Sequence, residues 1–324
     1  MFWSIFKFEI RYWLGQPMVY IFIFINALLI YGATASDSVQ VGGSIGNVHK
    51  NAPFVVENFY ALMSLISLLM VTAFLNVAAA RDFNFNTHQI IFSTPLRKFD
   101  FLMGRFWGAV VIAVIPFLGV SIGNMIGAIM PWLDAERTGP TYWNGHLTGL
   151  LVFIVPNVVF TGAFVFAIAA ITRSTIFSFI ASIILIVGYG ISLGLTRNLD
   201  NEFIGTMLDP FGIRTFSVAT KYWTVDDKNT MAMGLTGIML LNRMIWCGAG
   251  LLIFSFTYVR FSFSEKLRSS KRSKRRAVID SATPKVSQIL PEVTFSYSAS
   301  TSVRQFLNQV RIDFLGVLKS TAFI

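Results

Sequence analysis

The sequence RDFNFNTHQIIFSTPLRKFDFLMGR, residues 81–105, decides the fold because it separates two long apolar runs. Each run holds about twenty apolar residues, enough for an α-helix to cross the hydrocarbon core of a bilayer. Residues 81–105 carry charges at both ends and a turn at Ser93, Thr94 and Pro95. We therefore predict that this segment is a water-exposed loop at one face of a membrane.

The composition of the whole chain also indicates a membrane protein. Of its residues, 54% are hydrophobic and 13% are charged, and the mean hydropathy is +0.64. These values are far from those of a soluble domain. The apolar runs predict an all-α integral membrane protein with six transmembrane helices, forming one domain over residues 17–260. The predicted spans are residues 18–35, 59–80, 106–130, 149–171, 175–195 and 235–259.

Two features of these runs bear on helix packing. Gly119, Gly123 and Gly127 form a stripe in the third run, which would let a neighbouring helix approach closely, and Pro116 should bend that helix. Only residues 172–174 separate the fourth run from the fifth, so these two runs should form an antiparallel pair.

The positions of the basic residues set the predicted topology. The net charge is +10, and most Lys and Arg lie before the first run, in residues 81–105, at Arg173 and in residues 260–285. The positive-inside rule places these segments and both termini in the cytoplasm. The basic run KLRSSKRSKRRAV suits anionic lipids of the inner leaflet. Because this run follows a membrane exit directly and lacks interleaved aromatic residues, nucleic acid is not an expected partner.

Residues 2–14 are predicted to form an amphipathic elbow helix, which we assign to a separate segment of residues 1–16. One face carries Phe2, Phe6, Ile10 and Trp13, and the other carries basic residues, as in helices that lie along the headgroup plane. A secretory signal peptide, cleaved near residues 33–35, is the alternative. The long leader and the span-length apolar run favour the elbow helix.

The loop also carries a family pattern. Asp82, the pair Asn86 and Thr87, the STPL turn at residues 93–96, and Gly104 with Arg105 together resemble the coupling segment of type-2 ABC exporter permeases. Asn86 stands where that family usually has Gly, and Arg105 stands in place of Lys. The resemblance implies a short cytoplasmic coupling helix between spans two and three. It also implies an ATPase-coupling interface, formed by Arg81, Asp82, Thr87, Pro95, Leu96, Arg97, Lys98, Gly104 and Arg105, with Arg173 as a second, smaller contact.

The resemblance implies a permease subunit of an ATP-driven exporter. The chain has no GxxxxGK[ST] phosphate loop and no HExxH motif, so it is not expected to be an enzyme or to hold a cofactor. ATP would bind to a separate ABC subunit. A second six-span half would also be needed, from a dimer or from a longer polypeptide. His49, His88 and His146 fall on separate loops, and Cys247 is the sole cysteine, so no metal site is expected.

Residues 196–234 are too apolar for a free loop, and in the resembled family short helices dip into the membrane from outside at this position. DPFG at residues 209–212, KYWTVDDKN at 221–229 and LLNRMIW at 240–246 resemble one bacterial branch. In that branch, two permease halves are fused to a zinc aminopeptidase. This implies the bacterial inner membrane. A membrane scaffold for an extracytoplasmic peptidase is the alternative function. A secondary transporter would be expected to carry acidic or histidine residues in mid-span, and no run has a central Asp, Glu or His.

The end of the chain repeats features of its beginning. Lys7 aligns with Arg311, Glu9 with Asp313, and Leu14 with Leu318. We therefore predict a basic cytoplasmic tail and linker over residues 261–302, then a second elbow helix over residues 303–324 that begins a second permease half.

Some polar residues within or near the runs leave two interpretations open. Asn26, Asn76, Asn124 and Asn157 could line a translocation path or form interhelical hydrogen bonds. Arg243 could extend to the headgroups or pair with a carboxylate such as that of Asp209. His88 is expected to be a contact residue on the loop surface.

Overall fold

The computed structural model describes residues 1–36, 39, 47–196, 202–263 and 299–318. The described residues form helices and no strand, and six helical segments are long and apolar enough to cross a membrane. These are α2 (Pro17–Ala35), α3 (Pro53–Asn84), α5 to α6 (Lys98–Ala128), α7 to α8 (Trp143–Thr172), α9 (Thr175–Thr196) and α13 (Gly237–Arg260). The prediction of an all-α membrane protein with six spans is confirmed.

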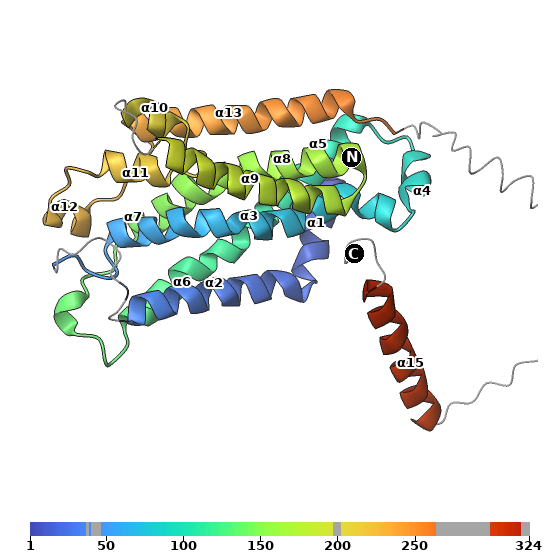
Figure 1. Ribbon diagram of the computed structural model, residues 1–324, viewed down its shortest axis with the longest axis horizontal. Helices are drawn as coiled ribbons and strands as arrows, with labels where there is room; N and C mark the ends of the chain where they lie inside the picture. The colour runs from blue at the N-terminus through green and yellow to red at the C-terminus, as the bar shows by residue number, and fades with distance from the viewer. Residues whose placement is uncertain (37–38, 40–46, 197–201, 264–298, 319–324) are drawn as a thin grey trace, which may run out of the picture. The chain divides into compact units, whose positions relative to one another are not determined.

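The remaining helices of the first unit, Met1–Phe263, gather at the two ends of the bundle (Figure 1). The α4 end holds the predicted elbow helix α1 (Phe2–Leu14) and the short helix α4 (His88–Phe92). The α12 end holds α7 (Trp143–Thr148), α10 (Glu202–Met207), α11 (Ile213–Ala219) and α12 (Val225–Thr230). The loop 81–105 and the segment 202–236 therefore lie at opposite ends of the bundle.

The centre of the bundle is formed by α3 and by α8 (Val155–Thr172). Of the 18 most apolar consecutive residues in each span, 61% are buried in α3 and 78% in the α7 to α8 segment. The corresponding shares are 22% in α2 and 28% in α13. Phenylalanines fill the contact between α5 (Lys98–Val114), α8 and α13, where Phe106 packs against Phe166 and Phe254 with ring centroids 5.6 and 4.6 Å apart. The peripheral helices expose their apolar faces, as helices that contact lipid do.

The predicted glycine stripe is a helix contact. Helix α6 (Leu118–Ala128) lies along α2, and a Cβ atom added at Gly119 or Gly123 would collide with the α2 backbone at Ile23 or Ala27. The predicted bend is also present, because a 3-10 turn (Ile115–Phe117) with Pro116 at its centre separates α5 from α6. These glycines allow the two backbones to approach closely.

Replacing Gly123 by Val should therefore push α2 and α6 apart. The new side chain meets backbone atoms of Ala27, which cannot rotate away, and overpacking of this kind costs about 1–3 kcal/mol. The measurement is the stability of the purified protein in a detergent unfolding titration. Gly188→Val is the matched control, since nothing lies within 4 Å of a Cβ atom at Gly188. Equal stability of the two variants would contradict the packing described here.

Hydrogen bonds tie the segments of the α12 end together. The Asn229 amide accepts from the His49 backbone N–H at 2.8 Å and donates to the Asn47 carbonyl at 2.9 Å. The buried carboxylate of Glu57 on α3 accepts the Met233 N–H, with N–O distances of 2.8 and 3.0 Å, and the hydroxyl of Thr148. The early loop and the late segment of the chain thus form one structure.

Segment 202–236 is partly buried, as its apolar composition predicts. Phe211 is fully buried, and Phe216 of α11 packs between Phe54 and Phe153, with ring centroids 5.2 and 5.3 Å away. Residues 197–201 of the predicted outer segment lie outside the described residues.

The second unit, Ser264–Ile324, is described only at α15 (Ala299–Leu318). This helix is amphipathic, because exposed apolar side chains recur on one face, at Val303, Phe306, Leu307, Val310 and Phe314. The predicted basic run and most of the predicted linker, residues 264–298, lie outside the described residues.

Candidate functional site

Four buried charged residues meet at the α4 end of the bundle. Glu9 on α1 binds Arg81 of α3, with 2.5 Å between Oε1 and Nη2, and also accepts from Arg105 of α5. Arg105 Nη2 donates to both carboxylate oxygens of Asp82, at 2.8 and 2.7 Å. Glu9 is fully buried, and the other three residues are 5–6% exposed. We call Glu9, Arg81, Asp82 and Arg105 the Glu9 cluster.

The cluster forms because α1 packs closely on α5. A Cβ atom at Gly104 would lie 2.8 Å from the Cβ of Ile5, and one at Gly108 would lie 2.7 Å from the Cβ of Glu9. The two glycines thus bring the Glu9 carboxylate within reach of Arg105. Gly104, which the family pattern assigns to the ATPase interface, is buried under α1.

Aromatic rings enclose the guanidinium groups of the cluster. The Arg81 guanidinium carbon lies 4.2 Å from the ring centroid of Tyr12, and that of Arg105 lies 5.5 Å from the ring of Phe101. Burial raises the pKa of Glu9 to about 7, and the Arg81 guanidinium opposes that rise. The two arginines therefore favour the ionised form of Glu9, against the effect of burial.

The loop between α3 and α5 turns sharply at Asn86, whose φ of 55° is left-handed. Asn adopts this conformation more readily than most residues, so it can replace the Gly of the family pattern. Helix α4 follows directly. His88 is 6% exposed, and its ring lies 5.1 Å from that of Phe83 and 6.1 Å from that of Phe92. The prediction that His88 lies on the loop surface is therefore wrong, because it fills the space between α3 and α4.

The structure divides the predicted coupling residues into two groups. Arg81, Asp82, Gly104 and Arg105 are buried, and the three charged residues form ion pairs within the chain. The other residues remain accessible: Thr87, Pro95 and Arg97 are exposed, and Leu96, Lys98 and Arg173 are half-buried.

Arg173 and Lys98 join the loop to neighbouring helices. Arg173 ends α8 in a left-handed conformation, with φ of 55°, and its guanidinium carbon lies 4.6 Å from the ring centroid of Phe83. Lys98 Nζ lies 4.8 Å from the ring centroid of Tyr258 on α13. The turn between α8 and α9 therefore lies against the beginning of the loop.

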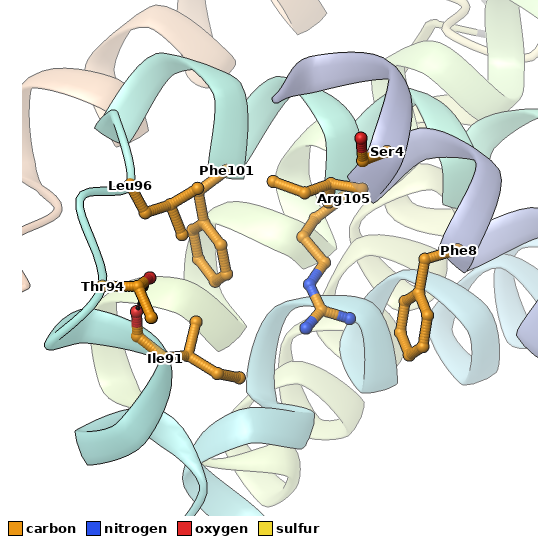
Figure 2. A pocket seen from close by; sticks show the side chains of 8 residues that line it. Ser4, Phe8, Ile91, Thr94, Leu96, Phe101 and Arg105 are labelled. Atoms are coloured by element: carbon orange, nitrogen blue, oxygen red, sulfur yellow. Dashed lines mark hydrogen bonds between the residues drawn. The ribbon is translucent and has the colours of Figure 1, made fainter.

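Two cavities adjoin the Glu9 cluster, with volumes of about 620 and 260 Å³, and Phe8, Ile91 and Arg105 line both. Figure 2 shows the smaller one, with the Arg105 guanidinium directed into it from α5 and Phe8 entering from α1. Thr94 and Leu96 form the wall on the loop side. The two ends of the loop are thus held by ion pairs, while residues of its middle line the two cavities.

The four asparagines predicted for a translocation path are 0–1% exposed. Three of the amides donate to a neighbouring helix and that of Asn157 donates to the turn between α10 and α11, which matches the alternative of hydrogen bonding within the bundle. The acceptors are the Pro116 carbonyl for Asn26 at 2.9 Å, the Thr175 carbonyl for Asn76 at 3.4 Å, Thr34 Oγ1 for Asn124 at 3.1 Å and the Phe211 carbonyl for Asn157 at 3.0 Å.

Arg243 is buried, at 3% exposed, and does not extend to the headgroups. Its Nη1 donates to Asn157 Oδ1 at 2.8 Å, and its Nε donates to Asn242 Oδ1 at 3.0 Å. The proposed acidic partner, Asp209, instead accepts backbone N–H groups and the Tyr189 hydroxyl. Arg243 thus follows the buried alternative: two amides are its direct hydrogen-bond partners, and the Asp209 carboxylate interacts with it electrostatically.

Glu9 is the residue of this site that sequence analysis missed. It lies between Phe6 and Trp13 at helical spacing, on the apolar face of α1. An acid on the apolar face of an amphipathic helix signals a buried partner, since an unpaired carboxylate there would be costly.

No protein-family model and no curated protein matches this chain.

Proposed function

We propose that this chain is the permease subunit of an ATP-driven ABC exporter, and that the loop 81–105 couples it to a separate ATP-binding subunit. The observation that supports the proposal is helix α4, which is carried between the second and third spans by a loop whose ends join the Glu9 cluster. A push on this loop would act on α1, α3 and α5 together.

The exposed side of the loop is the contact surface in this proposal. Phe85 and Ile90 are 70% and 73% exposed, and Thr87, Pro95 and Arg97 are also exposed. Apolar side chains that extend into water beside a basic residue are typical of a protein–protein contact. Arg173, which lies against Phe83, would form the second and smaller contact.

The proposed cycle is mechanical. ATP binding closes two ATP-binding subunits, the loop 81–105 moves with them, and the six helices rock between inward-open and outward-open arrangements. The ion pairs of Glu9 transmit the movement to α1 and α5, while the cavities beside Ile91 leave space for the middle of the loop. Two six-span halves are needed, from a second copy of this chain or from a longer polypeptide.

The proposal also sets location and partners. We place the chain in the bacterial inner membrane, with both termini and the loop 81–105 in the cytoplasm, because Lys and Arg concentrate in these segments. Its basic tail would bind anionic lipids. ATP would bind only to the partner subunit.

The test replaces Ile90 by Glu in the full chain. A charge placed at the centre of an apolar contact should reduce retention of the ATP-binding subunit at least about tenfold, which corresponds to about 1.4 kcal/mol. Retention is measured by affinity purification from membranes, with quantitative mass spectrometry of proteins that carry a phosphate loop and an assay of ATP hydrolysis in the eluate.

The matched control is Ile129→Glu, since Ile129 is 76% exposed and follows α6 at the other end of the bundle (Figure 1). This variant should retain the ATP-binding subunit as the unmodified chain does. The proposal fails if no ATP-binding protein is retained by the unmodified chain, or if Ile90→Glu retains it fully.

A further inference from the structure

Helix α9 buries hydroxyl-bearing residues and exposes large apolar ones. Among its described side chains, residues 175–194, the buried ones all carry a hydroxyl, Ser178, Ser182 and Tyr189, while Ala181, Leu185 and Ile186 are half-buried. Its exposed surface carries a series of large apolar side chains, namely Ile176, Phe177, Phe179, Ile180, Ile183, Ile184, Val187 and Ile191. A helix held in a bundle by apolar packing would bury residues of the second kind. Helix α9 instead turns its polar residues inward.

The inward face of α9 meets polar residues of α3. Thr72 Oγ1 and Ser182 Oγ lie 2.6 Å apart, and the Asn76 amide donates to the Thr175 carbonyl at 3.4 Å. Thr72 and Asn76 are 0% and 1% exposed. We call Thr72, Asn76, Thr175, Ser178 and Ser182 the polar seam.

The polar face of α9 continues toward the α12 end of the bundle. Tyr189 lies on the same face as Ser178 and Ser182 at helical spacing. Its hydroxyl donates to Asp209 Oδ1 at 3.2 Å, and Asp209 belongs to the turn between α10 and α11. Hydrogen-bonding groups therefore follow most of the length of α9.

Two groups of the seam are unsatisfied. Asn76 Oδ1 and Ser178 Oγ are buried, and neither has a hydrogen-bond partner in the described residues. An unpaired polar atom inside a membrane is costly. The amide oxygens of Asn26 and Asn124 are unpaired in the same way elsewhere in the bundle, so the seam is distinguished by having its unpaired atoms beside the hydroxyls of Thr72 and Ser182. Water entering between α3 and α9 would satisfy both atoms.

We propose that the polar seam opens into a water-filled passage between α3 and α9, which takes a solute rich in hydrogen-bonding groups. Hydroxyl and amide contacts between membrane helices are individually weak, and α9 has little other burial, at 22% of its apolar window. Separation therefore costs little and exposes hydroxyls and amides to the solute. That the passage carries an exported substrate rests on the proposed function. Whether water enters the seam can be tested without it.

The test is the water accessibility of single cysteines. Cys247 is the sole cysteine of the chain, so a Cys247→Ser background allows Ser178→Cys and Ser182→Cys to be labelled individually in membranes with a charged, water-soluble thiol reagent. Both substitutions preserve side-chain size closely. Two controls are Ala163→Cys in the dry core of α8, at 0% exposed, and Ile183→Cys on the lipid-facing side of α9, at 57% exposed.

We expect labelling at positions 178 and 182 to be at least about tenfold faster than at positions 163 and 183, because only a thiol in contact with water ionises and reacts. Labelling at 178 and 182 as slow as at 163 overturns the proposal. Equally fast labelling at 163 also overturns it, since water would then not be confined to the seam. Slow labelling of the seam would not change retention of the ATP-binding subunit. Failure of the unmodified chain to retain that subunit, or full retention by Ile90→Glu, would not change the labelling of the seam, so the two failures are distinguishable.

Discussion

Replacing Glu9 by Gln is expected to destabilise the protein by about 3–5 kcal/mol, the usual cost of breaking a buried ion pair from one side. Glu9 accepts from both Arg81 and Arg105 and is fully buried. Without its charge, two buried guanidinium groups share the single carboxylate of Asp82. The variant should therefore unfold at lower denaturant in a detergent unfolding titration.

Two further variants make this result specific. Lys7→Gln lies on the same helix at an exposed position and should change stability by less than about 0.5 kcal/mol. In the double variant Glu9→Gln with Arg81→Gln the cluster is again neutral, so part of the lost stability should return. A Glu9→Gln variant as stable as the unmodified chain would show that the cluster contributes nothing to the attachment of α1.

Replacing Asn157 by Leu is expected to cost about 2–4 kcal/mol, because a buried charge loses a hydrogen-bond acceptor. Asn157 Oδ1 accepts from Arg243 Nη1 at 2.8 Å, and Arg243 is 3% exposed within α13. The guanidinium cannot reach water, so the lost acceptor is not replaced. Thermal unfolding of the purified protein measures the effect.

Asn124→Leu is the matched control, since Asn124 is equally buried but binds only the neutral groups of Thr34 and Lys50, a hydroxyl and a backbone carbonyl. Its loss should be smaller, about 1–2 kcal/mol. Combining Asn157→Leu with Arg243→Met removes the charge and should recover stability. If the Asn124 variant loses more than the Asn157 variant, the role assigned to Arg243 is wrong.

The spans could be predicted well from sequence because length and hydropathy alone define them. The predicted second run began at residue 59, whereas α3 begins at Pro53 and includes Glu57. A carboxylate that accepts a backbone N–H and a hydroxyl can lie inside such a helix. Hydropathy treats it as an interruption, because partners distant in sequence are invisible to it.

The candidate site was predicted less well, for one physical reason. The family resemblance assigned Arg81, Asp82 and Arg105 to an interface, and His88 was expected on the loop surface, yet all four are buried. For Arg243, a position at the headgroups and a buried pairing were both left open, and it is buried. Burial of a polar residue depends on a partner, and the partners come from other helices. Glu9 was missed as well, although its position on the apolar face of α1 is a signal that could have identified it.

The polar seam shows a second limit of prediction from hydropathy. Serine and threonine barely change the hydropathy of a span, so the sequence drew attention to Asn76 but not to Thr72, Ser178 or Ser182. Helical spacing places Ser178, Ser182 and Tyr189 on one face of α9. A search for polar residues at helical spacing within apolar runs would have found this polar face of α9.

The ties at the α12 end have a consequence for biosynthesis. Glu57 is made early, but the Met233 N–H that it accepts is made after four further membrane crossings, as is the Asn229 amide that holds residues 47–49. Until the ribosome has delivered these donors, the nascent chain carries a carboxylate with an incomplete set of partners near the bilayer surface. Synthesis of residues 229–233, just before the last helix, is therefore the step that completes these contacts, and a translation product stalled before it should be a target for membrane quality-control proteases.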